Sequence, residues 1–162
     1  MAARVVCLDT NVLSWLFRTC RDQQEEKIDR AKELILHLKK EKTIVAIPAI
    51  VLAEALCFIP DDMVQDFLNE IRKSYLVFPF NEMAAYHYRI ITRSCRDMRV
   101  EGPRWSKSAD IKIISIALAN GASCLYSEDA DLAKLAANFL PVQGLPSLPP
   151  KQISLPLSPK AQ

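Results

Sequence analysis

The sequence predicts one α/β domain with a mainly parallel central sheet of four to five strands and helices on both faces. Short apolar runs alternate along the chain with longer amphipathic stretches, which is the order of parallel strands and their crossover helices. The 162 residues are enough for one domain and too few for two independent cores. Half of the residues are hydrophobic and a quarter are charged, as in ordinary globular proteins.

The residue patterns place the expected elements along the first half of the chain. A short β-branched or apolar run indicates a strand, whereas apolar positions that recur every three to four residues indicate a helix. The expected elements are, in order, a strand over 4–8, helices over 12–17 and 23–41, a strand over 43–47, and helices over 51–58 and 60–73. Pro48 suits the first turn of the helix that follows the second strand. The helix over 60–73 is expected to turn Met63, Phe67, Leu68 and Ile71 inward.

The second half continues the alternation and ends in a tail. The expected elements are a strand over 76–80, a helix over 82–98, a loop over 99–106, a strongly apolar helix over 109–119, a strand over 123–126 and a helix over 130–138. Gly121 suits the C-terminal cap of the apolar helix. Six of the ten prolines lie from Pro141 onward. We therefore expect a domain over 1–142, in which the sheet is briefly extended near Val142, and an irregular or flexible proline-rich tail over 143–162.

The composition disfavours several classes of protein. The net charge of +2 and the pI near 8.3 are only mildly basic and do not by themselves argue for a nucleic-acid partner. The five cysteines form no C-x-x-C pair and there are two histidines, which disfavours a disulfide framework or a zinc site. Cys7, Cys57 and Cys124 lie in apolar runs and are expected to be buried thiols. No segment resembles a signal peptide or a membrane span, so we expect a cytoplasmic protein without a membrane partner.

Four carboxylates lie at predicted strand exits or near the starts of predicted helices. Asp9 ends the first strand, Glu54 lies in the helix after the second, Asp110 lies in the first turn of the apolar helix, and Asp129 follows the last strand before the final helix. Because the carboxyl ends of parallel strands share one edge, these side chains are expected to converge there. Two carboxylates about 5 Å apart repel by roughly 3 kcal/mol at an effective dielectric near 20. A group of four therefore predicts a counter-ion with a preference for oxygen ligands, Mg²⁺ or Mn²⁺.

Each carboxylate also has a purely structural explanation. Asp9 and Asp129 suit helix N-caps, and Asp110 suits the first turn of a helix, where the dipole favours negative charge. Glu54 could lie on a solvated helix face. It is the hardest to explain in this way, because it is the lone charge in the apolar run 47–60 and an unpaired buried carboxylate costs several kcal/mol. The site is absent only if all four explanations hold together.

Four motifs in series resemble those of the PIN-domain nucleases, and in particular the VapC-type ribonucleases of toxin–antitoxin modules. They read LDTNVL, IPAIVLAEAL, KSADIKIISIALANGA and LYSEDADL, in the order of the family and over nearly the whole chain to about Val142. The resemblance implies a PIN-like α/β/α sandwich and a metal-dependent endoribonuclease that hydrolyses RNA phosphodiester bonds. It places the catalytic and metal-binding positions at Asp9, Glu54, Asp110 and Asp129, with Mg²⁺ or Mn²⁺ as the cofactor.

The resemblance also implies accessory residues and partners. Asn11 and Ser127 match polar positions near the metal. Glu128 and Asp131 flank Asp129, so the identity of the fourth acidic ligand stays open. Family members commonly form homodimers and bind an antitoxin protein. An apolar groove near Leu13, Trp15, Leu16 and Phe17 could receive such a segment, although these residues equally suit the core.

Contacts with RNA are expected just before the apolar helix. Arg104 and Lys107 could bind phosphates, and Trp105 could stack on a base; a solvated loop with a docked aromatic ring is the alternative. Two other functions compete with the nuclease. A PIN-like fold could serve as a non-catalytic RNA-binding or assembly module. An Asp-based phosphotransfer domain is disfavoured, because its usual second acidic residue is replaced here by Asn11.

Overall fold

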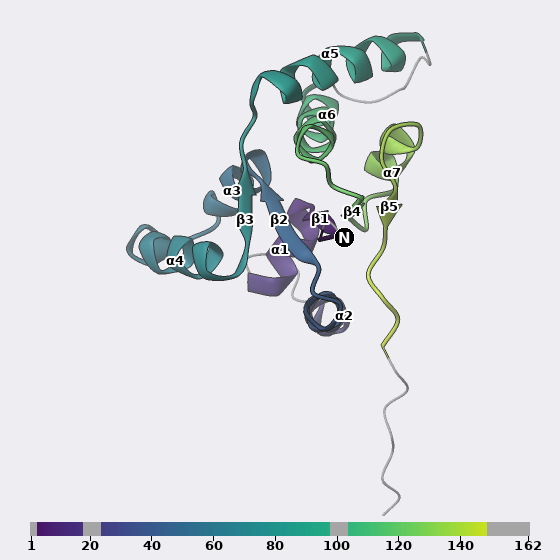
Figure 1. The fold of residues 1–162 in the computed structure, drawn as a ribbon. Coiled ribbons are helices and arrows are strands. Elements are labelled where there is room, and N and C mark those ends of the chain that lie inside the picture. The colour runs from purple at the N-terminus through teal and green to yellow at the C-terminus, as the bar shows by residue number, and fades with distance from the viewer. Residues whose placement is uncertain (1–2, 18–23, 98–103, 149–162) are drawn as a thin grey trace, which may run out of the picture.

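The computed structural model describes residues 3–17, 24–97 and 104–148. This part of the chain contains a five-stranded sheet in the order β3–β2–β1–β4–β5, in which all four pairings are parallel (Figure 1). The strands are β1 (Val5–Leu8), β2 (Ile44–Pro48), β3 (Leu76–Phe78), β4 (Cys124–Tyr126) and β5 (Val142–Gln143). Cys7 of the central strand lies opposite Ala46 on one side and Leu125 on the other. The predicted mainly parallel sheet is confirmed.

Helices connect each strand to the next. They are α1 (Thr10–Phe17), α2 (Glu25–Lys40), α3 (Ala49–Leu56), α4 (Val64–Ser74), α5 (Glu82–Asp97), α6 (Arg104–Ala119) and α7 (Ala130–Ala136), with a short 3₁₀ turn, η1 (Asp61–Met63), before α4. Gly121 ends α6 with a φ of 70°, the left-handed conformation expected of a glycine cap. None of the described helices is long and apolar enough to cross a membrane.

The sheet carries an apolar layer on each face because successive strand residues point to opposite sides. Val6 and Leu8 of β1 face α2, where Leu38 is fully buried. Cys7 faces the other way, into a larger cluster built from α3, α4, α5, α6 and α7 that includes the fully buried Ile114. In Figure 1, α2 lies below the strands, and α5 and α6 lie above them. This arrangement is the predicted α/β/α sandwich.

Some expected details are wrong. The helix α6 begins at Arg104, so the loop predicted over 99–106 extends too far, and Asp110 lies in the second turn rather than the first. The prediction followed apolar periodicity, which the polar first turn of this helix lacks. Met63 is 56% exposed rather than buried because it belongs to the 3₁₀ turn η1. Cys57 is exposed because α3 ends one residue earlier, at Leu56, and Pro48 ends β2 instead of lying inside α3.

The chain continues past β5 in an extended segment that packs against the domain. Within the predicted tail over 143–162, Gln143 belongs to β5, and Leu145 is 5% exposed in the cluster on the α2 face. Arg30 of α2 donates hydrogen bonds to the carbonyls of Leu145 (2.6 Å) and Pro146 (2.9 Å). The residues after Leu148 lie outside the described part. The segment from Gly144 to Leu148 thus extends the packed domain beyond its last strand.

Candidate metal and active site

Asp9 lies directly after β1 and is buried, with 5% of its surface exposed. Its Oδ1 accepts a hydrogen bond from the Thr10 N–H at 2.7 Å, and its Oδ2 accepts one from the Ser127 hydroxyl at 2.6 Å. A capping aspartate binds the second or third N–H of its helix, so capping does not explain this side chain. Burial is the main cause that raises the pKa of Asp9 to about 6; the two hydrogen bonds lower it, and the charges of Glu54 and Asp129 raise it further.

Ser127 connects two segments of the site. It follows β4 and is 4% exposed. Its hydroxyl donates to Asp9, accepts a hydrogen bond from the Asn11 amide at 3.2 Å, and accepts one from the Asp129 N–H at 3.0 Å. The Asn11 side-chain oxygen in turn accepts the Glu128 N–H at 3.5 Å. Asn11 and Ser127 therefore tie the end of β1 to the turn between β4 and α7.

Glu54 is half-buried on α3, and one of its oxygens accepts a hydrogen bond from the Thr10 hydroxyl. The lone charge of the apolar run 47–60 thus points toward the carboxyl end of β1 and not to an open helix face. Sequence reasoning did not select Thr10. The only signal was its place between Asp9 and Asn11, where a helix begins with a hydroxyl side chain.

Asp110 is half-buried in α6, and no described residue donates a hydrogen bond to its carboxylate. Burial is the main cause that raises its pKa to about 6, followed by the charges of Asp129, Asp9, Glu54 and Asp131, in that order. All four predicted carboxylates therefore share one electrostatic environment, although they come from four separate segments. An isolated first-turn aspartate stabilised by a helix dipole would show the opposite shift.

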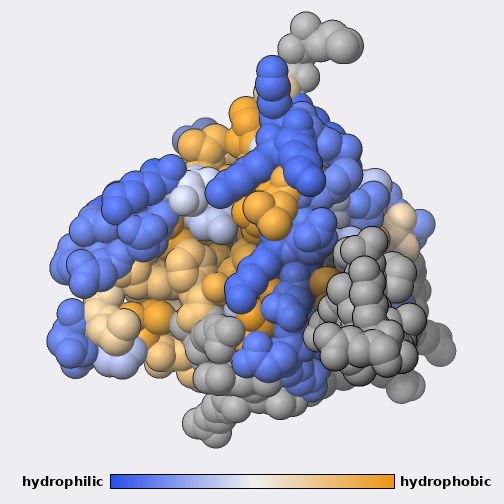
Figure 2. All heavy atoms as spheres, turned by 90° about the horizontal axis from the view of Figure 1, so that it is seen from below, coloured by the Kyte–Doolittle hydropathy of each residue, from blue (hydrophilic) through white to orange (hydrophobic). Residues whose placement is uncertain are grey.

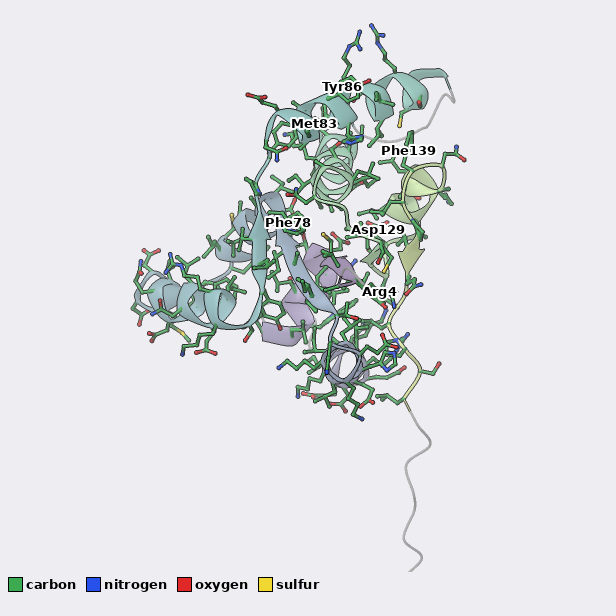
Figure 3. All side chains as sticks on the ribbon, viewed as in Figure 1. Arg4, Phe78, Met83, Tyr86, Asp129 and Phe139 are labelled. Atoms are coloured by element: carbon green, nitrogen blue, oxygen red, sulfur yellow. The ribbon has the colours of Figure 1, made fainter. Side chains whose placement is uncertain are left out.

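Asp129 caps α7, as one of the structural explanations predicted. A single oxygen, Oδ1, accepts the N–H groups of Asp131 (2.8 Å) and Leu132 (3.2 Å). The other oxygen accepts no hydrogen bond from the described residues. Figure 3 shows Asp129 at the junction between β4 and α7. Asp131 is different, because its side chain is 88% exposed and pairs with Lys134 at 3.5 Å.

Glu128 turns away from this group, toward α2. Its Oε2 lies 2.8 Å from the Lys27 ammonium, and its Oε1 lies 3.4 Å from the Arg30 guanidinium. Burial favours the neutral form, but hydrogen bonds from Lys27 and the Leu145 N–H and the two positive charges together lower the pKa of Glu128 below its usual value. Glu128 therefore has its counter-charges already and is not one of the converging carboxylates.

The donor set fits a divalent cation in type and charge. It offers only oxygen ligands, which Mg²⁺ and Mn²⁺ prefer. It includes Asp110, to which no described residue donates a hydrogen bond, and the second oxygen of Asp129. Among the described residues, no three acidic, histidine or cysteine side chains lie close enough together to hold a metal ion. The agreement thus concerns donor chemistry and electrostatics.

The predicted RNA contacts and the predicted apolar groove have different outcomes. The side chains of Arg104, Trp105 and Lys107 lie outside the described residues, although the backbone at these positions belongs to α6. The residues of the expected apolar groove are part of the core: Leu13 is buried, Trp15 and Leu16 pack against the α2 cluster, and Phe17 contacts Phe67 with ring centroids 4.9 Å apart. The helix α1 therefore supplies no open groove through these side chains.

A pocket of about 300 Å³ lies instead at the opposite edge of the sheet, at the amino ends of β2 and β3. Apolar side chains from Ile35, Ile44 and Leu76 line it, together with the cations of Lys39 and Arg72. Figure 2 shows this face, where a hydrophobic surface is hollowed between the hydrophilic surfaces of α2 and α4. The pocket is separate from the carboxylate group.

Comparison with known proteins identifies the family of this fold. The family model of the PIN domain matches residues 6–138, from β1 to just past α7. Among solved structures, the chain is similar to VapBC2 from Rickettsia felis bound to a DNA fragment from their promoter, with 18% identity and a TM-score of 0.66 over 88% of this chain and 99% of that one.

Two further structures are similar to the chain. VapBC-1 from nontypeable Haemophilus influenzae has 16% identity and a TM-score of 0.63 over 86% of this chain and 97% of that one. VapBC-5 from Mycobacterium tuberculosis, a member of the VapBC family of toxin-antitoxin systems, has 15% identity and a TM-score of 0.52 over 87% and 97%. A search of curated proteins gives no match. The sequence motifs, the parallel sheet and the match over most of the chain agree: the chain belongs to the PIN domain family.

Proposed function

We propose that this protein is a Mg²⁺- or Mn²⁺-dependent endoribonuclease and the toxin component of a toxin–antitoxin module, acting in the cytoplasm. The observation that carries the proposal is the grouping of Asp9, Glu54, Asp110 and Asp129 in one electrostatic environment, where burial and mutual repulsion raise the pKa of both Asp9 and Asp110 to about 6. A stable fold has no use for such repulsion, whereas a cation site does. Membership of a family of nucleases and the similarity to VapBC structures support the same function.

The proposal gives each residue a role. Asp9, Asp110 and the second oxygen of Asp129 bind the metal, and Glu54 completes the acidic group or positions the attacking water. A divalent ion bound there supplies a Lewis acid that activates water and neutralises charge on the phosphodiester. Ser127 holds the Asp9 carboxylate in place through its 2.6 Å hydrogen bond. We prefer Asp129 to Asp131 as the fourth ligand because the Asp131 carboxylate is solvated and paired with Lys134.

The polar residues of the first motif orient the ligands. Thr10 donates its hydroxyl to Glu54, and Asn11 holds Ser127 and the Glu128 N–H. Groups of this kind that support metal ligands typically change metal affinity or activity by about 10- to 100-fold when removed. Contacts between RNA and Arg104, Trp105 and Lys107 at the start of α6 are part of the proposal.

Cleavage of RNA with Mg²⁺ or Mn²⁺, compared with an EDTA control, tests the function. We expect cleavage only with metal. Asp9→Asn and Asp110→Asn should each lower the rate of RNA cleavage by more than the roughly 100-fold typical of the removal of a group that supports a metal ligand. Asp66→Asn is the matched control, because Asp66 is an exposed carboxylate on α4 outside the group. Undiminished metal-dependent cleavage by Asp9→Asn would exclude this mechanism. RNA binding without cleavage would favour the non-catalytic module instead, and transfer of phosphate from a donor to Asp9 would favour the phosphotransfer domain.

We propose an antitoxin as the protein partner, with the pocket between α2 and α4 as one docking site. The apolar lining and the cations Lys39, Arg72 and Lys73 suit a partner segment that combines apolar and acidic residues. The product of a neighbouring open reading frame is the probe, with binding measured by calorimetry. Arg72→Glu should weaken antitoxin binding and leave the rate of RNA cleavage and the unfolding temperature unchanged. An unchanged affinity for the antitoxin would show that this face is not part of the interface.

A homodimer is the second proposed assembly. Exposed apolar side chains gather on the edge strand β3 and the start of α5, namely Leu76, Val77, Phe80, Met83 and Tyr86. Figure 3 shows Met83 and Tyr86 on α5, at the end of the molecule remote from α2. Light scattering should give twice the 18.3 kDa chain mass, and Tyr86→Glu should reduce it to the single-chain value. A single-chain mass for the unaltered protein at micromolar concentration would refute the dimer.

A further inference from the structure

Glu128 stands between two residues of the acidic site but serves neither as a ligand nor as a solvated charge. Its side chain is 18% exposed and accepts three hydrogen bonds. Lys27 donates to Oε2 at 2.8 Å, while the Leu145 N–H and Arg30 donate to Oε1 at 2.7 Å and 3.4 Å. The Lys27 ammonium also lies 4.8 Å from the centre of the Trp15 ring. Three segments far apart in sequence therefore meet at this carboxylate.

Arg30 extends the connection to the chain that follows β5. Besides its contact with Glu128, it donates to the carbonyls of Leu145 at 2.6 Å and Pro146 at 2.9 Å. Leu145 itself is buried on the α2 face. The turn after β4, the helix α2 and the segment after β5 are thus held together through one guanidinium and one carboxylate, with a second cation, Lys27, beside them.

Gly144 shows how closely these segments approach. A Cβ atom built at this position would lie 2.9 Å from Glu128 Oε1. This distance is shorter than the van der Waals contact between a carbon and an oxygen atom. The requirement for glycine here comes from this contact, because any side chain would displace the Glu128 carboxylate from its partners. Gly144 therefore offers a way to disturb Glu128 without replacing it.

The backbone on both sides of Glu128 belongs to the acidic site. Ser127 donates a hydrogen bond to Asp9, and the Asp129 carboxylate caps α7 through one of its two oxygens. These residues lie in the three-residue turn between the end of β4 at Tyr126 and the start of α7. A side chain that is held in place at the middle of so short a turn limits the backbone dihedral angles around it. It therefore restricts the positions of the residues on both sides.

We propose that Glu128 is a positioning residue of the metal site: clamped by Lys27, Arg30 and the backbone of Leu145, it fixes the orientation in which Ser127 and Asp129 meet Asp9. This inference rests on the proposed function. The segment from Gly144 to Pro146 then supports the site. The first turns of α2 support it too, through Lys27 and Arg30, although α2 supplies no metal ligand.

Metal binding by full-length variants tests the inference without relying on cleavage. Mn²⁺ is titrated by calorimetry into the unaltered protein, Glu128→Gln, Lys27→Met and Gly144→Ala, at a temperature well below unfolding. We expect each variant to bind Mn²⁺ about tenfold more weakly, and Lys27→Arg to restore most of the affinity. Glu70→Gln is the matched control: it removes an ion pair of the same 2.8 Å length, to Lys73 on α4, and should change nothing.

Hydrogen exchange provides a second readout. The N–H groups of Asp131 and Leu132, which bind Asp129, should exchange faster in the three variants than in the unaltered protein and the control. Gly144→Ala and Lys27→Met keep the test decisive if Glu128→Gln does not fold. Lower unfolding temperature with unchanged Mn²⁺ affinity and unchanged exchange at these amides would overturn the inference, because Glu128 would then support only the fold. If instead the unaltered protein binds no Mn²⁺, or Asp9→Asn binds it equally well, the proposed function itself fails.

Discussion

Replacing Asp9 by asparagine should make the metal-free protein more stable at neutral pH, even though Asp9 is central to the proposed site. The residue is 5% exposed, and burial raises its pKa from 3.8 to about 6. Between these values the folded protein binds a proton at Asp9 that the unfolded chain does not. The contribution of Asp9 to stability is therefore fully present below pH 3.8 and is lost as the pH rises through 6. A difference of about two pKa units corresponds to about 3 kcal/mol of stability lost at neutral pH.

Asparagine removes this cost but also changes the hydrogen bonds. Its oxygen can still accept the Thr10 N–H, while the bond from Ser127 to a charged oxygen is lost, which costs about 1–2 kcal/mol. The net gain should be about 1–2 kcal/mol. For a chain of this size, that gain raises the unfolding temperature by about 2–8 °C.

Calorimetric unfolding in EDTA at pH 7.5 and pH 5 measures the effect. The advantage of Asp9→Asn should be present at pH 7.5 and should shrink at pH 5, where Asp9 of the unaltered protein binds its proton. Adding Mn²⁺ should reverse the order, because only the unaltered protein then gains the binding free energy. Asp66→Asn removes a first-turn carboxylate of α4, so it should change stability slightly and equally at both pH values, and Mn²⁺ should stabilise it as much as the unaltered protein. The reasoning is refuted if Asp9→Asn is less stable by the same amount at both pH values.

Three other substitutions probe the site and the core. Ser127→Ala removes a hydrogen bond that lowers the pKa of Asp9, so the acidic limb of the pH–rate profile should move to higher pH; an unmoved limb would separate Ser127 from Asp9. Thr10→Val removes the donor to Glu54 and should reduce metal-dependent cleavage by about tenfold or more, whereas Thr10→Ser should retain it; equal loss in both would point to packing. Ile114→Ala opens a cavity at a fully buried position and should lower the free energy of unfolding in urea by about 2–5 kcal/mol. Its affinity for Mn²⁺ should stay unchanged, and a loss of affinity would show that the core and the site are coupled.

Local patterns were sufficient to predict the order of the elements. The alternation of apolar runs and helical periods can be recognised in the local sequence, and a helix between two successive strands implies that the strands are parallel. They were insufficient where a helix begins with polar residues, as α6 does at Arg104, because periodicity of apolar residues is the signal that such a turn lacks. They also left the exposure of Met63 and Cys57 wrong, since both depend on how a short connection turns after α3.

The sequence by itself determined which segments end at the acidic edge, because a strand that is followed by a helix must deliver its next residues there. It thereby indicated Asp9, Glu54 and Asp129 as candidates, whereas Asp110, which follows the helix α5 and not a strand, was chosen for its place near the start of the apolar helix. Only the tertiary structure decided how the neighbouring carboxylates divide. Among the described residues, Asp129 accepts hydrogen bonds through one oxygen only, Asp131 is exposed, and Glu128 binds Lys27, a residue 101 positions away. The direction of a side chain depends on partners brought near by packing, and no local pattern records them.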